Sequence, residues 1–240
     1  GITADGVRPF INGEGAPWGV PHAALRAELR AGGHDPSYDH PSLFRLRDDL
    51  FALMANHEYG ERGDDANGLT RATLQARAEC HRIVEVLRSR GGPWSSVRIV
   101  ATGAQIGVRE ARRVRGRYLL TVGDMERGAR FEDGICRATF CVDLHPPDKE
   151  DGGISHCGVR TLPYDIPLRA LIARDVDGLL LAGRCISGDY LAHASYRVTG
   201  NAVAMGQAAG LCAALAARAG VPPHAVPAAE VRAALGPLPD

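Results

Sequence analysis

The most informative hydrophobic pattern lies in the last third of the chain. Leu179 to Ala182 is an unbroken apolar run, which is typical of a strand buried on both faces of a parallel sheet. After a loop, small and apolar residues at helical spacing predict a helix from about Thr199 to Ala219, with Gly220 in the position that ends it. We therefore expect a strand, a loop and a long helix in this order.

The early turns of this helix are rich in small residues, and Gly206 and Gly210 lie four positions apart. Residues at this spacing share one side of a helix, so that side is nearly bare backbone. Such a side fits closely against either a sheet or a flat ligand. The preceding loop also leaves backbone N–H groups of the helix N-terminus at the carboxyl edge of the sheet, where ligands bind in open α/β folds. A helix that is simply well packed on a sheet explains the pattern equally well.

Elsewhere the pattern predicts further helices. Thr70 to Arg90 has apolar residues on one face and a capping residue in Thr70, with Gly91-Gly92-Pro93 behind it. The residues expected on that buried face are Leu74, Ala78, Val84 and Leu87. A shorter helix is predicted from His22 to Arg30, stopped by Gly32-Gly33. Between Leu43 and Met54 helical spacing competes with a hairpin that turns at Asp48-Asp49, and the sequence leaves both open.

Short apolar runs predict strands at Val97 to Ala101, Tyr118 to Val122 and Ala138 to Leu144. The polar, glycine-rich stretch from Pro146 to Gly158 is expected to be a loop. This mixture of helix and sheet predicts an α/β or α+β fold. Its length of 240 residues suits one large domain or two small ones.

Charge and cysteine content indicate which partners and which cellular compartment suit the chain. Lys and Arg total 28, as do Asp and Glu, so no net charge draws the chain to nucleic acid or a membrane. The six cysteines include no CxxC pair, which indicates reduced thiols and a cytoplasmic protein. No signal peptide is visible, and the apolar stretch 201–217 falls short of the ~20 residues that a bilayer requires. The chain opens with Gly1 rather than Met, which fits a trimmed tag or a piece of something longer.

Four blocks in order resemble the FAD-dependent oxidoreductases built on a glutathione-reductase-like FAD fold. The most specific is residues 179–215, LLLAGRCISGDYLAHASYRVTGNAVAMGQAAGLCAAL, which is similar to their C-terminal flavin-contacting segment. The others are AQIGVREARRVRGRYLLT at 104–121, FEDGICRATFCVDLH at 131–145 and YDIPLRAL at 164–171. Four ordered blocks are far more specific than a single glycine pattern.

The resemblance also shows what this sequence lacks. Such enzymes begin with a strand, a GxGxxG turn and a helix that bind the FAD pyrophosphate. The nearest candidate is Gly13-Glu14-Gly15, but Trp18 occupies the third glycine position. The resemblance therefore implies the C-terminal portion of a partial Rossmann-like FAD/NAD(P)-binding domain with a substrate or cap domain. We expect a substrate or cap region at 1–100, a connecting segment at 101–160, and the final FAD-domain strand and helix at 161–240.

The resemblance implies that the helix N-terminus faces the pyrimidine end of the isoalloxazine and that Val198 packs on or beside the ring. Arg184 and Arg197 would hold phosphate, ribityl hydroxyls or a substrate carboxylate, and each also has a reading as a surface ion pair. Ser187 and Ser195 either bond the cofactor or satisfy the loop backbone. The full set of implied cofactor contacts is Gly183, Arg184, Ser187, Ser195, Arg197, Val198, Thr199, Gly200 and Asn201.

His145 is the candidate proton donor or acceptor, because a histidine titrates near neutral pH and the matching family block carries one there. Its alternative is a structural loop histidine. Arg109 and Arg112, from an arginine-rich block, are the candidate substrate-binding residues, while the block is too local to predict a nucleic-acid site. His145, His156 and Cys157 fit no standard zinc spacing, so no metal is expected.

Three functions follow. The first is an FAD-dependent oxidoreductase that moves a hydride between a small organic substrate and flavin. The second is a non-catalytic fragment or subunit, in which a homo-oligomer or a complementing chain completes the FAD site. The third is a small-molecule binding module that keeps this scaffold without flavin.

Overall fold

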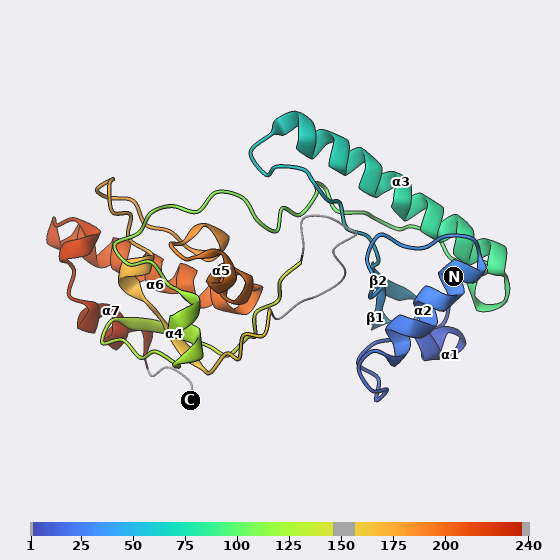
Figure 1. Cartoon of the computed structure of the whole chain (residues 1–240), viewed down its shortest axis with the longest axis horizontal. Helices are drawn as coiled ribbons and strands as arrows, with labels where there is room; N and C mark the ends of the chain where they lie inside the picture. The colour runs from blue at the N-terminus through green and yellow to red at the C-terminus, as the bar shows by residue number, and fades with distance from the viewer. Residues whose placement is uncertain (1, 146–156, 237–240) are drawn as a thin grey trace. The chain divides into compact units, whose positions relative to one another are not determined.

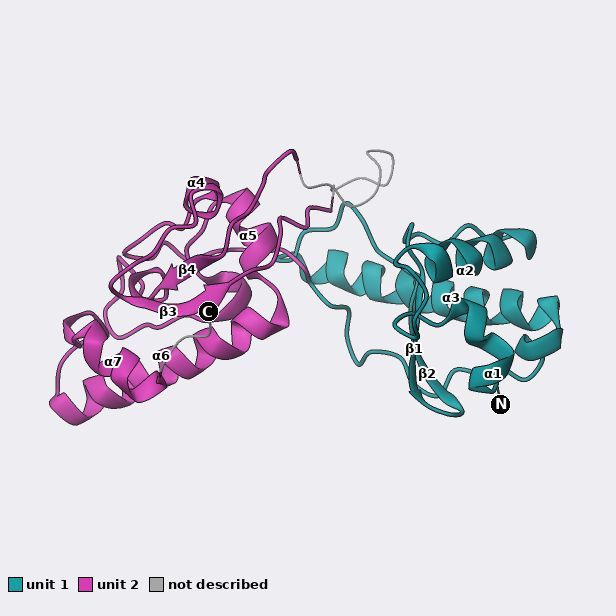
Figure 2. Cartoon of the chain, turned by 90° about the horizontal axis from the view of Figure 1, so that it is seen from below, with its two compact units in different colours: residues 1–108, 147–153 teal, residues 109–146, 154–240 magenta. Residues whose placement is uncertain are grey.

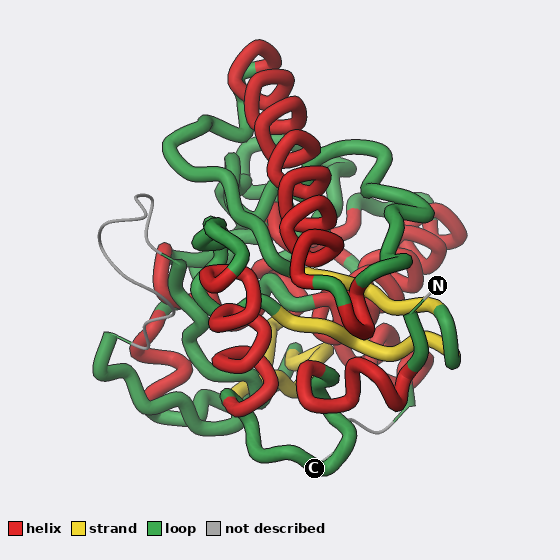
Figure 3. The backbone as a smooth tube through the Cα atoms, turned by 90° about the vertical axis from the view of Figure 1, so that its right-hand side faces the viewer, coloured by secondary structure: helices red, strands yellow, loops and turns green. Residues whose placement is uncertain are grey.

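A computed structural model describes residues 2–145 and 157–236, which form two compact units (Figure 1). Within these residues, unit 1 covers 2–108 and unit 2 covers 109–145 and 157–236 (Figure 2). Helices and loops account for most of the backbone, and strands are few and short (Figure 3). This confirms the expected mixture of helix and sheet. The functional regions expected at 1–100, 101–160 and 161–240 are not tested by this division and stay predictions.

The described residues of unit 1 combine helices with one β-hairpin. The largest fully buried side chains of unit 1 include Trp94, Ile11, Leu25 and Leu29. The elements of unit 1 are α1 (Ala4–Val7), η1 (Arg8–Phe10), α2 (Val20–Ala31), β1 (Ser42–Arg47), β2 (Leu50–Met54), α3 (Ala66–Arg90) and η2 (Gly92–Trp94).

The hairpin β1–β2 settles the alternative that the sequence leaves open between Leu43 and Met54. The two strands pair antiparallel, with Ser42 opposite Met54 and Leu43 opposite Leu53. Leu43 is buried, whereas the side chains of Leu46 and Met54 are exposed. Buried and exposed residues do not alternate regularly along these two strands. The spacing of the apolar residues in the sequence was therefore also compatible with a helix.

The predicted helix at 70–90 is confirmed as α3, but it begins earlier. Asp65 caps it, accepting a hydrogen bond from the Asn67 backbone N–H at 3.0 Å. The Thr70 hydroxyl instead donates to the Ala66 carbonyl inside the helix, at 2.8 Å, so Thr70 as the cap was wrong. The face prediction was also partly wrong, because Leu74 is 64% exposed. The buried positions of α3 are Gly68, Ala72, Ile83 and Leu87.

In the part of unit 2 that the structure describes, β3 pairs with β4 in a two-stranded antiparallel sheet, where Ala138 lies opposite Tyr164. The core of unit 2 includes the buried side chains of Tyr164, Ile166 and Met205. The elements of unit 2 are α4 (Val122–Glu126), β3 (Gly134–Ala138), β4 (Tyr164–Pro167), η4 (Leu168–Ala170), η5 (Gly183–Cys185), α5 (Tyr190–Tyr196), α6 (Thr199–Ala219), η6 (Pro223–Ala225) and α7 (Ala228–Leu235).

The apolar run Leu179 to Ala182 does not form the parallel strand that the sequence predicts. It is an extended segment bridged antiparallel to residues 171–173, with the Leu181 N–H donating to the Leu171 carbonyl at 2.8 Å. Leu179 is 41% exposed. A strand buried on both faces requires strands beside it and layers above and below. The described part of the chain supplies a partner segment along one edge only.

The other strand predictions fail for related reasons. Residues 97–101 form no strand, and Val100 is 72% exposed. Residues 118–122 contribute only an isolated bridge at Leu120, and Val122 opens α4, which Thr121 caps. The strand expected at 138–144 lies upstream, as β3. Residues 146–156 of the predicted loop lie outside the described residues.

Helix α6 agrees with the prediction at both ends, and Gly220 takes the left-handed conformation that terminates it, with φ 66°. Its buried side is formed by Met205, Ala208, Ala209, Cys212 and Ala216. Gly206 and Gly210 are exposed, with open space where a side chain would stand. The bare side predicted from the sequence therefore exists, and it faces away from the core of unit 2.

By length and apolar composition, α6 meets the two criteria for a membrane-spanning helix. Core helices of soluble proteins can meet the same criteria. The 21-residue helix is longer than the apolar stretch 201–217 on which the sequence expectation rested. The absence of a membrane partner accordingly stays a prediction.

Two glycines allow a paired test of this packing. A Cβ on Gly188 would lie 2.4 Å from the ring of Tyr196, which is fully buried, whereas a Cβ on Gly206 would meet nothing. We expect Gly188→Ala to lower the free energy of unfolding by about 2 kcal/mol. Gly206→Ala should raise it by about 0.5 to 1 kcal/mol, because alanine loses less backbone entropy in a helix. Urea unfolding followed by circular dichroism measures both, and similar effects of the two substitutions would contradict this packing.

Candidate functional site

The carboxylate of Asp143 lies at the centre of a charged cluster in unit 2. Its oxygens lie 3.2 and 3.3 Å from Nε2 of His145. Arg197 donates to the backbone carbonyl of Asp143 and lies 3.4 Å from its carboxylate. Arg109 is close enough to act on both charges. The structure thus brings together three residues that the sequence assigned separately: His145, Arg197 and Arg109.

The cluster is largely shielded from water, since the side chains of His145 and Arg197 are each 11% exposed. Burial acts to raise the pKa of Asp143, but the hydrogen bond from His145 and the positive charges of His145, Arg197 and Arg109 outweigh it and lower that pKa. The pKa of Arg197 is lowered, first by burial and then by Arg109, with Asp143 opposing both. Asp143 therefore stays ionised and holds the side chains of His145, Arg197 and Arg109 near one another.

Local backbone structure explains why these side chains meet. Asp143 and His145 are two residues apart in an extended segment, so their side chains project on the same side. The Asp143 N–H donates to the Ala194 carbonyl at 3.3 Å, which ties this segment to α5. Asp189 caps α5, accepting from the Ala192 N–H at 2.7 Å, and also accepts from the Val122 N–H at 2.8 Å. Arg197 follows directly where α5 ends.

The N-terminus of α6 is the second part of the candidate site. Val198 precedes the helix and makes no side-chain cap. Thr199 and Gly200 are exposed, and no atom lies within 4 Å of a Cβ placed on Gly200. The amide nitrogen Nδ2 of Asn201 is buried without a hydrogen-bond partner in the described structure. Uncapped helix N–H groups and an unused amide donor together favour an anionic or electron-rich ligand.

Three of the predicted cofactor contacts lie inside unit 2. Ser195 is fully buried, and its hydroxyl bonds the Phe140 carbonyl and the Tyr164 hydroxyl. Ser187 is 2% exposed and lies against Gly116. Gly183 is buried, with φ 73°. The packing of these residues suffices to explain them, and their contact with a cofactor stays a prediction.

Arg184 and Arg112 are exposed, in contrast to Arg109, which is half-buried beside Asp143. The structure therefore separates the two predicted substrate-binding arginines by environment. Among the described residues, no group of three His, Cys, Asp or Glu side chains is placed to hold a metal. His156, part of the zinc alternative, lies outside them.

Sequence reasoning missed Asp143, Glu110 and His193. The two-residue spacing of Asp143 and His145 was a usable signal. His193, by contrast, sits in an apolar helix and gives no sign of its environment. It is 1% exposed, neither ring nitrogen has a hydrogen-bond partner within the described chain, and Nδ1 lies 3.8 Å from a Glu110 carboxylate oxygen. Burial lowers its pKa from 6.5 to about 4.

A family model described as FAD dependent oxidoreductase matches residues 20–235. The match extends over both units and includes the Asp143 cluster and the N-terminus of α6. A search of curated proteins and one of solved structures found no match to this chain.

The buried His193 makes stability depend on pH. Because its pKa is about 4 in the folded chain and 6.5 ordinarily, its neutral form is favoured by folding. The contribution to stability is complete above pH 6.5 and is lost as the pH falls towards 4, by about 3 kcal/mol in all. His193→Phe should remove this pH dependence and change stability far less at pH 8 than at pH 4.5, because an apolar ring of similar size replaces the neutral imidazole.

The exposed His224 offers the matched control, since His224→Phe should keep the pH dependence. Both tryptophans, Trp18 and Trp94, lie in unit 1, so urea unfolding between pH 4.5 and 8 is best followed by circular dichroism. An unchanged pH dependence in His193→Phe would show that another group is responsible.

Proposed function

Because the chain belongs to the family of FAD-dependent oxidoreductases, we propose that unit 2 forms the flavin-contacting end of an enzyme that moves a hydride between a small organic substrate and FAD. The observation that carries this proposal is the open N-terminus of α6, with the Asp143 cluster in the same unit. FAD supplies the hydride chemistry, and its reduced ring carries negative charge near N1 and the C2 carbonyl.

The described residues fit this cofactor. The first N–H groups of α6 have no side-chain cap, so they are available to electron-rich atoms. Gly200 presents bare backbone, which permits close approach of a flat ring. The unbonded Nδ2 of Asn201 adds one more donor. The helix dipole would favour the reduced, negatively charged form of a ring bound there.

In this proposal His145 gives or takes the substrate proton. Its Nε2 is held by Asp143, which fixes the orientation of the imidazole. Arg197 and Arg109 supply positive charge for a carboxylate or phosphate of the substrate. Asp143 therefore acts as a positioning residue that keeps the proton carrier and the anion-binding group together.

We further propose that tight FAD binding requires a dinucleotide-binding segment of the glutathione-reductase-like type, because residues 1–240 contain no strand followed by GxGxxG. The exposed side of α6, with Gly206, Gly210 and the 67% exposed Val203, is suited to close packing against such a segment. A longer form of the chain or a complementing chain of different sequence would supply it. The alternative function is a non-catalytic subunit, which would show no turnover even after a dinucleotide-binding segment completes the FAD site. A cytoplasmic location is part of the same proposal.

The first prediction concerns whether residues 1–240 alone suffice for tight FAD binding. We expect the purified chain, after incubation with FAD and gel filtration, to elute without flavin absorbance, since the pyrophosphate-binding segment is missing. The visible spectrum of the eluted peak is the measurement, and the elution volume gives the oligomeric state. Flavin retained by this chain, as a monomer or as an oligomer, would contradict the need for a further segment, and retention on an oligomer would show that copies complete the site without it.

The second prediction concerns the N-terminus of α6 and weak binding of the flavin ring itself. Thr199→Asp places a negative charge there, which favours the helix but repels electron-rich atoms of the ring. We expect it to weaken FMN binding about tenfold, the equivalent of one charge interaction. Quenching of flavin fluorescence measures this, with Ala213→Asp on the exposed side of α6 as the control. Equal FMN affinity in wild type and Thr199→Asp would place the flavin elsewhere.

A further inference from the structure

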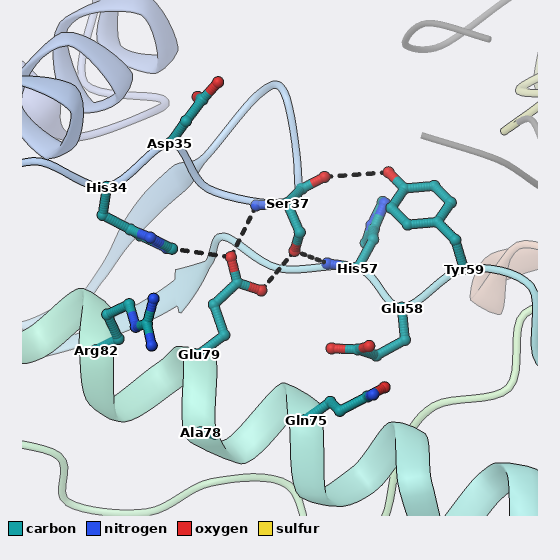
Figure 4. A pocket seen from close by; sticks show the side chains of 10 residues that line it. All are labelled: His34, Asp35, Ser37, His57, Glu58, Tyr59, Gln75, Ala78, Glu79 and Arg82. Carbon is teal, nitrogen blue, oxygen red and sulfur yellow. Dashed lines mark hydrogen bonds and ion pairs between the residues drawn. The ribbon is translucent and has the colours of Figure 1, made fainter. Parts of the chain in front are cut away.

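An open pocket of about 480 Å³ lies in unit 1, between α3 and the loops that precede β1 and follow β2 (Figure 4). This volume falls in the range of small-molecule sites. The pocket is independent of the residues assigned to flavin, and nothing in the proposed function uses it. Three carboxylates line it. Asp35 is bound by Arg26 and Arg30, and the other two, Glu79 and Glu58, lie in different environments.

Glu79 is fully engaged by the protein. Its carboxylate accepts hydrogen bonds from the Ser37 backbone N–H at 2.8 Å and the Ser37 hydroxyl at 2.5 Å. Nε2 of His34 lies 3.2 Å from the same group. Figure 4 shows these contacts on one side of the pocket, with Arg82 next to Glu79. Glu79 therefore belongs to a fixed wall of the pocket.

Glu58 differs because it makes no hydrogen bond or ion pair within the described structure. Its carboxylate reaches from the loop after β2 towards the interior of the pocket, above the amide of Gln75 (Figure 4). Burial raises its pKa, and the negative charges of Glu79 and Glu61 raise it further. An unpaired carboxylate with negative neighbours is stabilised by a cation placed beside it.

A cation bound beside Glu58 would be organic rather than metallic. Among the described residues no three metal-ligating side chains converge, in this pocket or elsewhere. The wall near Glu58 combines the ring of Tyr59, the methyl group of Ala78 and the amide of Gln75. Such a lining provides apolar contact for a carbon body and a polar partner for an ammonium N–H.

We infer that this pocket binds a small organic ammonium ion, with its charged nitrogen at Glu58 and its apolar body against Tyr59 and α3. Phenethylamine is a suitable probe, because it pairs an ammonium group with an apolar ring. 2-Phenylethanol is its neutral counterpart of similar shape. The site predicts binding of the amine and at least about tenfold weaker binding of the alcohol, as expected for a charge-assisted hydrogen bond.

Titration calorimetry on the full chain at pH 7.5 tests this with a matched pair of variants. Glu58→Gln keeps the shape of the side chain and removes its charge, whereas Glu85→Gln removes a charge from an exposed position on α3 outside the pocket. We expect Glu58→Gln to weaken amine binding about tenfold and Glu85→Gln to leave it unchanged. Since Glu58 has no partner, Glu58→Gln should melt at the wild-type temperature or above.

Three results would overturn the assignment. The first is equal affinity of the wild-type chain for the amine and the alcohol, which would show apolar binding alone. The second is unchanged amine affinity in Glu58→Gln, which would place the ammonium elsewhere. The third is absence of amine binding by the wild-type chain at millimolar concentration. Because flavin takes no part in the measurement, none of these results bears on the oxidoreductase proposal.

Discussion

The ionised carboxylate of Asp143 is the constraint on which the candidate site depends. Arg197 is largely buried, and an unpaired guanidinium there would lose much of its hydration without compensation. Asp143 supplies the compensating charge and also contacts His145. The same residue fixes the extended segment to α5 through its backbone. Without this carboxylate, Arg109 and Arg197 would repel each other beside the start of α6.

In unit 2, ion pairs between carboxylates and arginines fix loops that strand pairing would fix in a fold with a larger sheet. The described residues of unit 2 form one pair of strands, and their loops are fixed by carboxylates that bind several donors at once. Asp165, for example, accepts from Arg130 and Arg137, each at 3.1 Å. Asp133 accepts from both the backbone and the side chain of Arg169. Bidentate and shared arginine contacts are directional, so they position loops as well as neutralise charge.

The sequence predicts those elements whose ends are encoded locally. Glycines follow the ends of α2 and α6, and the bounds of both helices were predicted to within two residues. Strands depend on a partner elsewhere in the chain, so the apolar run at 179–182 gave no sign that it would pair antiparallel along one edge. The candidate site shows the same difference between features encoded locally and features set by tertiary packing. His145 and its neighbour Asp143 could be read from their spacing, but the approach of Arg197, 54 positions away, is set by tertiary packing.

The central claim is that the N-terminus of α6 contacts the flavin ring, with the substrate-binding Arg197 directly beside it in the chain. Two-dimensional NMR of the ¹⁵N-labelled chain during addition of FMN tests it at the level of single residues. We expect the largest shifts at the backbone amides of Thr199, Gly200 and Asn201 and at Arg197, with unit 1 unaffected. Shifts confined to unit 1, or shifts in unit 2 that leave these four residues unchanged, would contradict the claim.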